Sequence, residues 1–150
     1  MQLAIPAPNL LESETELNCV LHHVGFVVES INNTAEGFAL SLGTTWDGKI
    51  FEDHLQRVKV TFLVSGKGAS LELVEPCGMN SPAASFGRRG GGLHHVCYEV
   101  PALDEQLRAV RSSGGIVVKP PLPAVAFEGR RIAWVFTRYK LLIEYLERKK

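Results

Sequence analysis

Alternating apolar and polar residues predict a β-strand near the start of the chain. In the segment LHHVGFVV, residues 21–28, Val24, Phe26 and Val28 recur at every second position, as they do on one face of a strand. Apolar segments near 44–50, 57–64 and 69–75 are also expected to be strands, and the SGKG sequence between the last two is typical of a hairpin turn.

A helical spacing of apolar residues follows the first strand. In SINNTAEGFALSLG, residues 30–43, apolar side chains recur every three or four positions. Ser30 or Asn32 can cap the start of this helix, and Gly43 can end it. The order expected for this part of the chain is therefore one strand, one helix and three strands, or βαβββ.

The second half of the chain shows the same order. We expect a strand at 93–100, a helix within ALDEQLRAVRSSGG at 102–115, and strands near 115–119, 129–136 and 141–147. Between the two halves, Ser81 is a candidate N-cap and Pro82 a candidate first residue of a short helix, and a run of glycines follows.

A step of 72 residues relates the two halves. The sequence LHHV occurs at 21–24 and again at 93–96, so it contains four of the five histidines. The same step relates Glu72 to Glu144 and Phe62 to Trp134. Such matches at one offset indicate a duplicated module.

The duplication predicts the organisation of the chain. We expect an N-terminal extension at 1–20, a first βαβββ module at 21–76, a linker with a short helix at 77–92 and a second βαβββ module at 93–150. Residues 21–150 would form one structural domain of the α+β class, in which the two modules build a cupped, barrel-like mixed sheet.

Composition narrows the classes of function. The chain has 150 residues, of which 16 are basic and 16 acidic, so its formal net charge is zero and we expect no nucleic-acid or membrane partner. No segment approaches the roughly 18 apolar residues of a membrane span, and the first residues lack the basic segment of a signal peptide. We therefore expect a cytoplasmic protein whose three cysteines are reduced thiols.

Strand alternation assigns the two histidines of each pair to opposite faces. His22 and His94 share parity with the apolar residues that should pack against the helices. His23 and His95 would then point to the other, concave face of the sheet. Only the second histidine of each pair is therefore predicted to have a role in a site.

Two glutamates are predicted to face these histidines. Glu72 and Glu144 lie at corresponding places in the last strand of each module, opposite in parity to the apolar residues around them. Two imidazoles and two carboxylates are a plausible set of ligands for a divalent cation such as Co, Ni, Mn, Fe or Zn. A single histidine or glutamate on a strand is more often an ordinary surface or hydrogen-bonded residue, so the prediction depends on the repeat.

The sequence resembles the vicinal oxygen chelate superfamily, which includes glyoxalase I, extradiol dioxygenases and the fosfomycin- and bleomycin-resistance proteins. Within it, the segments LHHVGFVVESI, ASLELVEP, SPAASFGRRGGGLHHVCYEV, GRRIAWVF and LLIEYLE are most similar to the methylmalonyl-CoA epimerase family. The resemblance covers about 21–147 and implies two βαβββ modules in a cupped sheet. It also implies the metal ligands His23, Glu72, His95 and Glu144.

The resemblance also implies a reaction. A divalent metal would stabilise an enolate, and the protein would be an epimerase or isomerase acting above all on methylmalonyl-CoA or a related acyl thioester. Glu52, with Asp53 in reserve, and Glu144 would be the catalytic bases. On the same grounds we expect a homodimer.

A coenzyme A thioester would need partners for its phosphates. Arg88, Arg89, Arg130, Arg131 and Lys140 are available for that role, and Trp46 is a candidate for the wall of a pocket. The TRYK loop before the last strand is shorter than the corresponding segment of the epimerase family, which weakens the coenzyme A part of this interpretation more than the metal site.

Two alternatives remain open at this point. A glyoxalase I-like enzyme also uses four protein ligands, whereas an extradiol dioxygenase generally uses two histidines and one glutamate, so Glu72 argues against the latter. The other alternative is a non-catalytic binding or resistance protein that holds a small molecule in a metal-free cup. The presence of all four candidate ligands argues against it.

Overall fold

The computed structural model describes residues 19–64 and 66–150, and within them an 8-stranded sheet with three α-helices and one 3₁₀ helix. Most of the predicted N-terminal extension, 1–20, lies outside the described residues. The elements in chain order are β1 (Val20–Val27), α1 (Ile31–Ser41), β2 (Phe51–Asp53), β3 (Val58–Leu63), β4 (Ser70–Pro76), α2 (Ala84–Arg88), β5 (Gly92–Val100), α3 (Leu103–Ser112), β6 (Ile116–Pro123), η1 (Val125–Phe127), β7 (Arg131–Phe136) and β8 (Leu142–Glu147).

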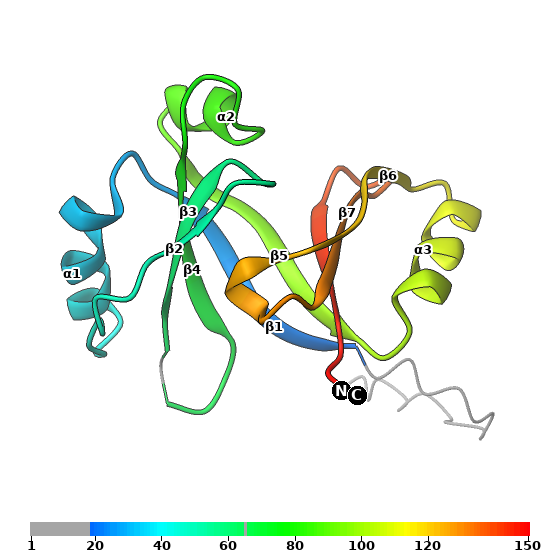
Figure 1. Ribbon diagram of the computed structural model, residues 1–150, viewed down its shortest axis with the longest axis horizontal. Coiled ribbons are helices and arrows are strands. Elements are labelled where there is room, and N and C mark those ends of the chain that lie inside the picture. Colours follow the sequence, from blue (N-terminus) through cyan, green and yellow to red (C-terminus); the bar gives the residue numbers. More distant parts are fainter. Residues whose placement is uncertain (1–18, 65) are drawn as a thin grey trace, which may run out of the picture.

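The sheet is mixed and symmetric about its centre. Its strand order is β2-β3-β4-β1-β5-β8-β7-β6. Strands β1 and β5 are antiparallel to each other, and each is parallel to the last strand of its own half, β4 or β8. The sheet curls into a half-barrel, with α1 and α3 at its two ends (Figure 1). The predicted fold class is confirmed.

Each long helix packs on the outer face of its half of the sheet. The buried side chains Ile31, Ala35 and Ala39 of α1 contact Leu63 and Leu73. In the other half, the corresponding cluster contains Leu103, Leu107, Val110, Val135 and Ile143. The Ser30 hydroxyl accepts a hydrogen bond from the backbone N–H of Asn33 at 3.4 Å, as expected for the N-cap of α1. Because the helices occupy the outer face, the inner face is left for a site.

Some element boundaries predicted from the sequence are wrong. Residues 44–50 do not form a strand; Trp46 and Lys49 are instead tied to Thr61, whose hydroxyl accepts from Trp46 Nε1 at 2.8 Å and donates to the Lys49 carbonyl at 2.6 Å. The strand predicted at 115–119 extends to Pro123, because β6 is an edge strand, where proline costs no ladder bond. Helix α2 begins at Ala84, after a turn that contains Ser81 and Pro82.

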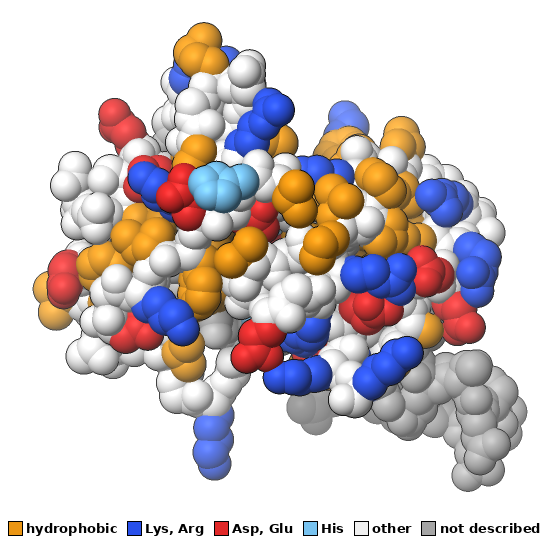
Figure 2. Space-filling view, in the orientation of Figure 1, with side chains coloured by type: hydrophobic (Ala, Val, Ile, Leu, Met, Phe, Trp, Pro, Cys, Tyr) orange, Lys and Arg blue, Asp and Glu red, His pale blue; other side chains and the backbone are white. Residues whose placement is uncertain are grey.

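The surface carries both signs of charge. Figure 2 shows acidic and basic side chains interspersed on one face, with hydrophobic side chains gathering over both halves of the sheet. Among the described residues, no helix is long and apolar enough to cross a membrane.

Candidate metal centre

A β-bulge lies at each repeated histidine pair. In the pairing of β1 with β5, His22 is the extra residue between the Leu21–Tyr98 and His23–Cys97 pairs. On the other strand, His94 is the extra residue between positions 93 and 95, which pair with Phe26 and Gly25. A bulge interrupts the alternation of side chains along a strand. Both histidines of a pair can therefore lie on the concave side of the sheet.

The predicted position of His22 and His94 on the helix face is consequently wrong. The ring of His22 lies 5.4 Å from that of Phe127 on the inner side of the sheet. The ring of His94 lies 5.0 Å from that of Phe86 in α2, and His94 lines the central cavity. The sequence contained no signal for the bulges, because a strand with an extra residue and a regular strand can have the same apolar pattern.

The four predicted ligands come together on the central strands β4, β1, β5 and β8. His23 Nε2 lies 3.3 Å from a Glu72 carboxylate oxygen, 3.1 Å from one of Glu144 and 3.2 Å from His95 Nε2. His95 Nε2 lies 3.2 Å and 3.4 Å from the same carboxylate oxygens. All four side chains are buried. One ligand atom from each residue therefore points at a common point, and we call this group the quartet.

The donor atoms of the quartet fit a divalent cation better than they fit hydrogen bonds among the four residues alone. Glu144 Oε2 is buried and lies 3.1 Å from His23 Nε2 and 3.4 Å from His95 Nε2, yet it forms no hydrogen bond of acceptable geometry within the described residues, although such an atom normally has one. The four ligand atoms also lie within 4.8 Å of one another. Two neutral imidazoles with two carboxylates are a set of donors that suits transition-metal ions.

Charge within the quartet is balanced by the residues themselves. Burial opposes ionisation of every member, but contact with His23 and His95 lowers the pKa of Glu72 and of Glu144. Conversely, and again against the effect of burial, the charge of Glu72 raises the pKa of His23 well above its usual value, and contact with the carboxylates of Glu144 and Glu72 raises the pKa of His95. A cation bound at this place would compete with the protons of the two histidines.

Close packing around the histidine rings fixes their positions. A Cβ atom at Gly25 would overlap the ring of His95, so this residue has to be glycine for the ring to lie where it does. The Phe62 ring meets the edge of His23 at 5.5 Å between ring centroids, and Trp134 meets His95 at 4.6 Å. The 72-residue repeat thus provides an aromatic contact for each ligand histidine.

A cavity of about 430 Å³ opens beside the quartet. Glu72, His95 and Glu144 line it, and most of its other walls are apolar, from side chains such as Val60, Val74, Phe127, Ile132 and Trp134. Its other polar side chains include Asp53, Gln56 and Lys119. A small, mostly apolar molecule with a few polar groups matches this lining.

The two acidic residues of β2 point in different directions. The Glu52 side chain is 52% exposed, lies 3.7 Å from His54 Nδ1 and does not line the cavity. Asp53 is buried, lines the cavity and accepts hydrogen bonds from the backbone N–H groups of Gln56 at 2.9 Å and Val125 at 3.5 Å. Asp53, the second candidate base predicted from the sequence, thus lies beside the cavity.

The basic residues predicted to hold phosphates lie away from the cavity lining. Arg130 is ion-paired with Glu99 at 2.9 Å, and Arg131 with Glu147 at 2.6 Å. Arg88, Arg89 and Lys140 do not line the cavity either, and Trp46 packs in the α1 cluster. Lys119, which the sequence analysis missed, does line the cavity, and its Nζ donates to Gln56 Oε1 at 3.0 Å.

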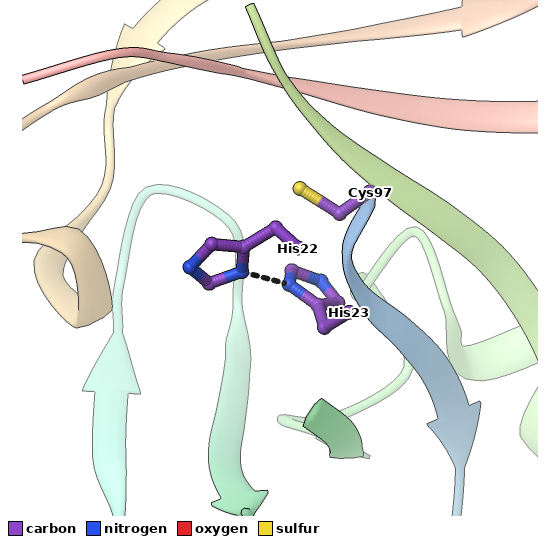
Figure 3. Close-up of side chains that lie close together, drawn as sticks. All are labelled: His22, His23 and Cys97. Carbon is purple, nitrogen blue, oxygen red and sulfur yellow. Dashed lines mark hydrogen bonds between the residues drawn. The ribbon is translucent and has the colours of Figure 1, made fainter. Parts of the chain in front are cut away.

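A second cluster adjoins the quartet. His22, His23 and Cys97 lie close together, as Figure 3 shows, and His22 Nδ1 is 2.9 Å from His23 Nδ1. Burial, together with the charge of Glu144, raises the pKa of the Cys97 thiol to about 12. Because the thiolate is the form that binds metals, this cluster is a poorer metal site than the quartet and is better described as the surroundings of His23.

Comparison with known proteins identifies the family. The model of the glyoxalase/bleomycin resistance protein/dioxygenase superfamily matches residues 22–134. The chain belongs to this superfamily. It is 31% identical over 132 residues to the uncharacterized protein YqjC of Bacillus subtilis, with 86% of this chain and 92% of the relative covered. It is 24% identical over 117 residues to an ethylmalonyl-CoA/methylmalonyl-CoA epimerase of Cereibacter sphaeroides, with 77% and 86% covered.

Solved structures of epimerases share the fold. Methylmalonyl-CoA epimerase from Mycobacterium tuberculosis superposes with a TM-score of 0.77 at 23% identity, covering 94% of this chain and 95% of that one. A methylmalonyl-CoA epimerase in complex with methylmalonyl-CoA and NH4+ superposes with a TM-score of 0.72 at 21% identity, covering 86% and 94%. Structural neighbours of this superfamily member therefore bind a coenzyme A thioester, while the similarity itself shows the shared fold.

Proposed function

We propose that the protein is a divalent-metal-dependent epimerase or isomerase that acts on an acyl thioester such as methylmalonyl-CoA. The observation that carries this proposal is the quartet itself, whose four buried ligand atoms lie within 4.8 Å of one another beside a cavity of about 430 Å³. The similarity to an ethylmalonyl-CoA/methylmalonyl-CoA epimerase supports the choice of substrate class.

His23, Glu72, His95 and Glu144 would hold the metal. Cobalt, nickel, manganese, iron and zinc all suit this mixture of nitrogen and oxygen ligands. When bound, the ion supplies positive charge that stabilises the oxygen of an enolate. The apolar wall around the quartet strengthens that effect, because charges interact more strongly where water is excluded.

Proton transfer would be the task of two carboxylates that line the cavity. Glu144 is one candidate base, since its buried carboxylate belongs to the quartet and also lines the cavity. For the second base we propose Asp53 in place of Glu52, because Asp53 lines the cavity and Glu52 does not. Epimerisation then needs one carboxylate to remove the proton and the other to return one on the opposite face.

Lys119 and Gln56 would orient the substrate. Lys119 forms no ion pair within 4.0 Å in the described part of the chain. Burial lowers the pKa of its amine, despite the nearby charge of Asp53. A cation in a mostly apolar cavity is costly when it has no closely paired carboxylate. It would be stabilised by the carboxylate or phosphate of an acyl thioester, so Lys119→Met should raise KM about tenfold, while exposed Lys67→Met should not.

The direct test is isotope exchange. The protein is loaded with cobalt and incubated with methylmalonyl-CoA in D₂O, and deuterium at the acidic carbon is followed by mass spectrometry. We expect exchange by the wild type and by Glu52→Gln, and a loss of about 10²-fold or more in Asp53→Asn. Absence of exchange by a metal-loaded wild type would reject the epimerase, and turnover of a hemithioacetal instead would favour a glyoxalase-type isomerase.

A further inference from the structure

The second ring nitrogen of each ligand histidine faces another histidine. His22 Nδ1 lies 2.9 Å from His23 Nδ1, and His94 Nδ1 lies 3.0 Å from His95 Nδ1. In both pairs, the Nε2 atom of the second histidine points into the quartet. Figure 3 shows the first pair, with a dashed line that joins a nitrogen of the His22 ring to a nitrogen of the His23 ring. The same arrangement occurs twice, 72 residues apart.

Two Nδ1 atoms at this distance must share one hydrogen, so one donates and the other accepts. An imidazole that binds a metal through Nε2 has its hydrogen on Nδ1, and a buried N–H group requires an acceptor. The neighbouring Nδ1 is that acceptor when the neighbour carries its own hydrogen on Nε2. When His22 and His94 are the acceptors, His23 and His95 are in the tautomer that leaves Nε2 free to bind a cation.

The bulges make this pairing possible. In a regular strand His22 and His94 would point away from their neighbours, to the opposite face. The extra residue in each strand brings them to the inner side, where aromatic rings hold them. Phe127 meets the edge of the His22 ring at 5.4 Å, and Phe86 that of His94 at 5.0 Å. Each first histidine is thus itself held in one orientation.

We propose that His22 and His94 are positioning residues that fix the tautomer and orientation of the two ligand histidines, so that the doubled histidine is a functional unit in each module. This rests on the metal centre of the proposed function but not on its reaction. Loss of such outer hydrogen-bond partners typically weakens metal affinity by about 10- to 100-fold.

The test measures metal binding without activity. Cobalt affinity is determined by competition with a chelator, and the visible spectrum of bound cobalt is recorded, for the variants His22→Leu, His22→Asn, His94→Leu and His94→Asn. Leucine removes the acceptor, whereas the amide oxygen of asparagine can replace it. His54→Leu is the control, because the His54 side chain is 85% exposed and lies 3.7 Å from Glu52, outside the quartet.

We expect both leucine variants to lose about 10-fold or more in affinity with an altered cobalt spectrum, and the asparagine variants to recover most of it. Thermal unfolding of the metal-free variants shows whether a loss is merely a loss of folding. Wild-type affinity in the leucine variants, or equal losses with leucine and asparagine, would overturn the proposal. So would a second bound equivalent of cobalt that disappears in His22→Leu, because His22 would then be a ligand itself. Failure of the deuterium exchange alone leaves these affinities unaffected and rejects only the reaction.

Discussion

The two modules provide equivalent ligands but surround them differently. At the position that faces the neighbouring ligand histidine, the first module has Gly25 and the second has Cys97. The ring of His95 lies over Gly25, where there is no side chain, whereas His23 is paired with the buried Cys97. A duplicated sheet thus keeps its ligands in symmetric places while the packing around each one differs.

The edges of the sheet differ as well. In the first module the edge strand β2 contains three residues, whereas β6 in the second contains eight and is followed by η1. That helix brings Phe127 over His23, with the two rings stacked at 5.8 Å. The second module therefore covers the ligand of the first, and the cavity is enclosed by contacts between modules, including the bond from Lys119 to Gln56.

The largest expected difference between the modules lies in their two glutamates. If Glu144 is both ligand and base while Glu72 is a ligand only, Glu144→Gln should lower kcat for isotope exchange by about 10²- to 10⁴-fold, and Glu72→Gln by much less. Both variants keep an amide oxygen that can bind metal, so kcat is to be measured at saturating cobalt. Equal losses in the two variants would show that the modules are equivalent in function as well as in position.

The next largest difference is expected between substitutions at the equivalent positions Gly25 and Cys97. Gly25→Ala places a methyl group where the His95 ring lies, which should cost about 1–3 kcal/mol of stability and displace a ligand. Cys97→Ala removes one buried sulfur and should cost about 1 kcal/mol. Denaturant unfolding gives both values, and cobalt titration should show impaired binding in Gly25→Ala alone. Normal cobalt binding in Gly25→Ala would mean that the ring has another position available.

A fall in pH should destabilise the protein through Glu99 and Glu147, two glutamates of the second module that are ion-paired with arginines. Despite partial burial, hydrogen bonds from Arg130 and Arg148 lower the pKa of Glu99, and hydrogen bonds from Arg131 lower that of Glu147. A depressed folded-state pKa contributes stability above the unfolded value near 4.5, and this stability is lost as pH falls further. Between pH 5 and 3, metal-free Glu99→Gln should therefore lose less stability on acidification than the wild type, by about 1 kcal/mol. Parallel pH profiles would contradict this assignment.

The smallest predicted difference concerns two ion pairs at equivalent positions of the modules, Lys59–Glu75 and Arg131–Glu147. Arg131 makes two hydrogen bonds to Glu147, at 2.9 and 2.6 Å, whereas Lys59 and Glu75 in the first module are 3.7 Å apart. Both basic side chains are 40% exposed, so solvent screens both pairs. We expect Arg131→Met to cost about 0.5–1 kcal/mol and Lys59→Met about 0.3 kcal/mol or less in denaturant unfolding. A larger cost for Lys59→Met would remove this distinction between the modules.

Much of the fold and part of the candidate site follow from the sequence alone. The 72-residue repeat relates the two βαβββ units, and the periodicities of apolar residues locate α1, α3 and most strands, because burial of one face imposes a spacing that can be counted. The same repeat selects His23, Glu72, His95 and Glu144, which the structure brings together. Their role as metal ligands stays a prediction, as do the boundaries of the modules and the homodimer.

Only the tertiary structure decided which other residues lie beside the quartet and in its cavity. The bulges that turn His22 and His94 inward depend on the pairing of β1 with β5, which lie far apart in the sequence. The presence of Asp53 rather than Glu52 in the cavity depends on the direction of a three-residue strand, and the presence of Lys119 there depends on the position of an edge strand. Local spacing determines which face of an element is apolar, but contacts between distant segments determine which polar side chains share one cavity.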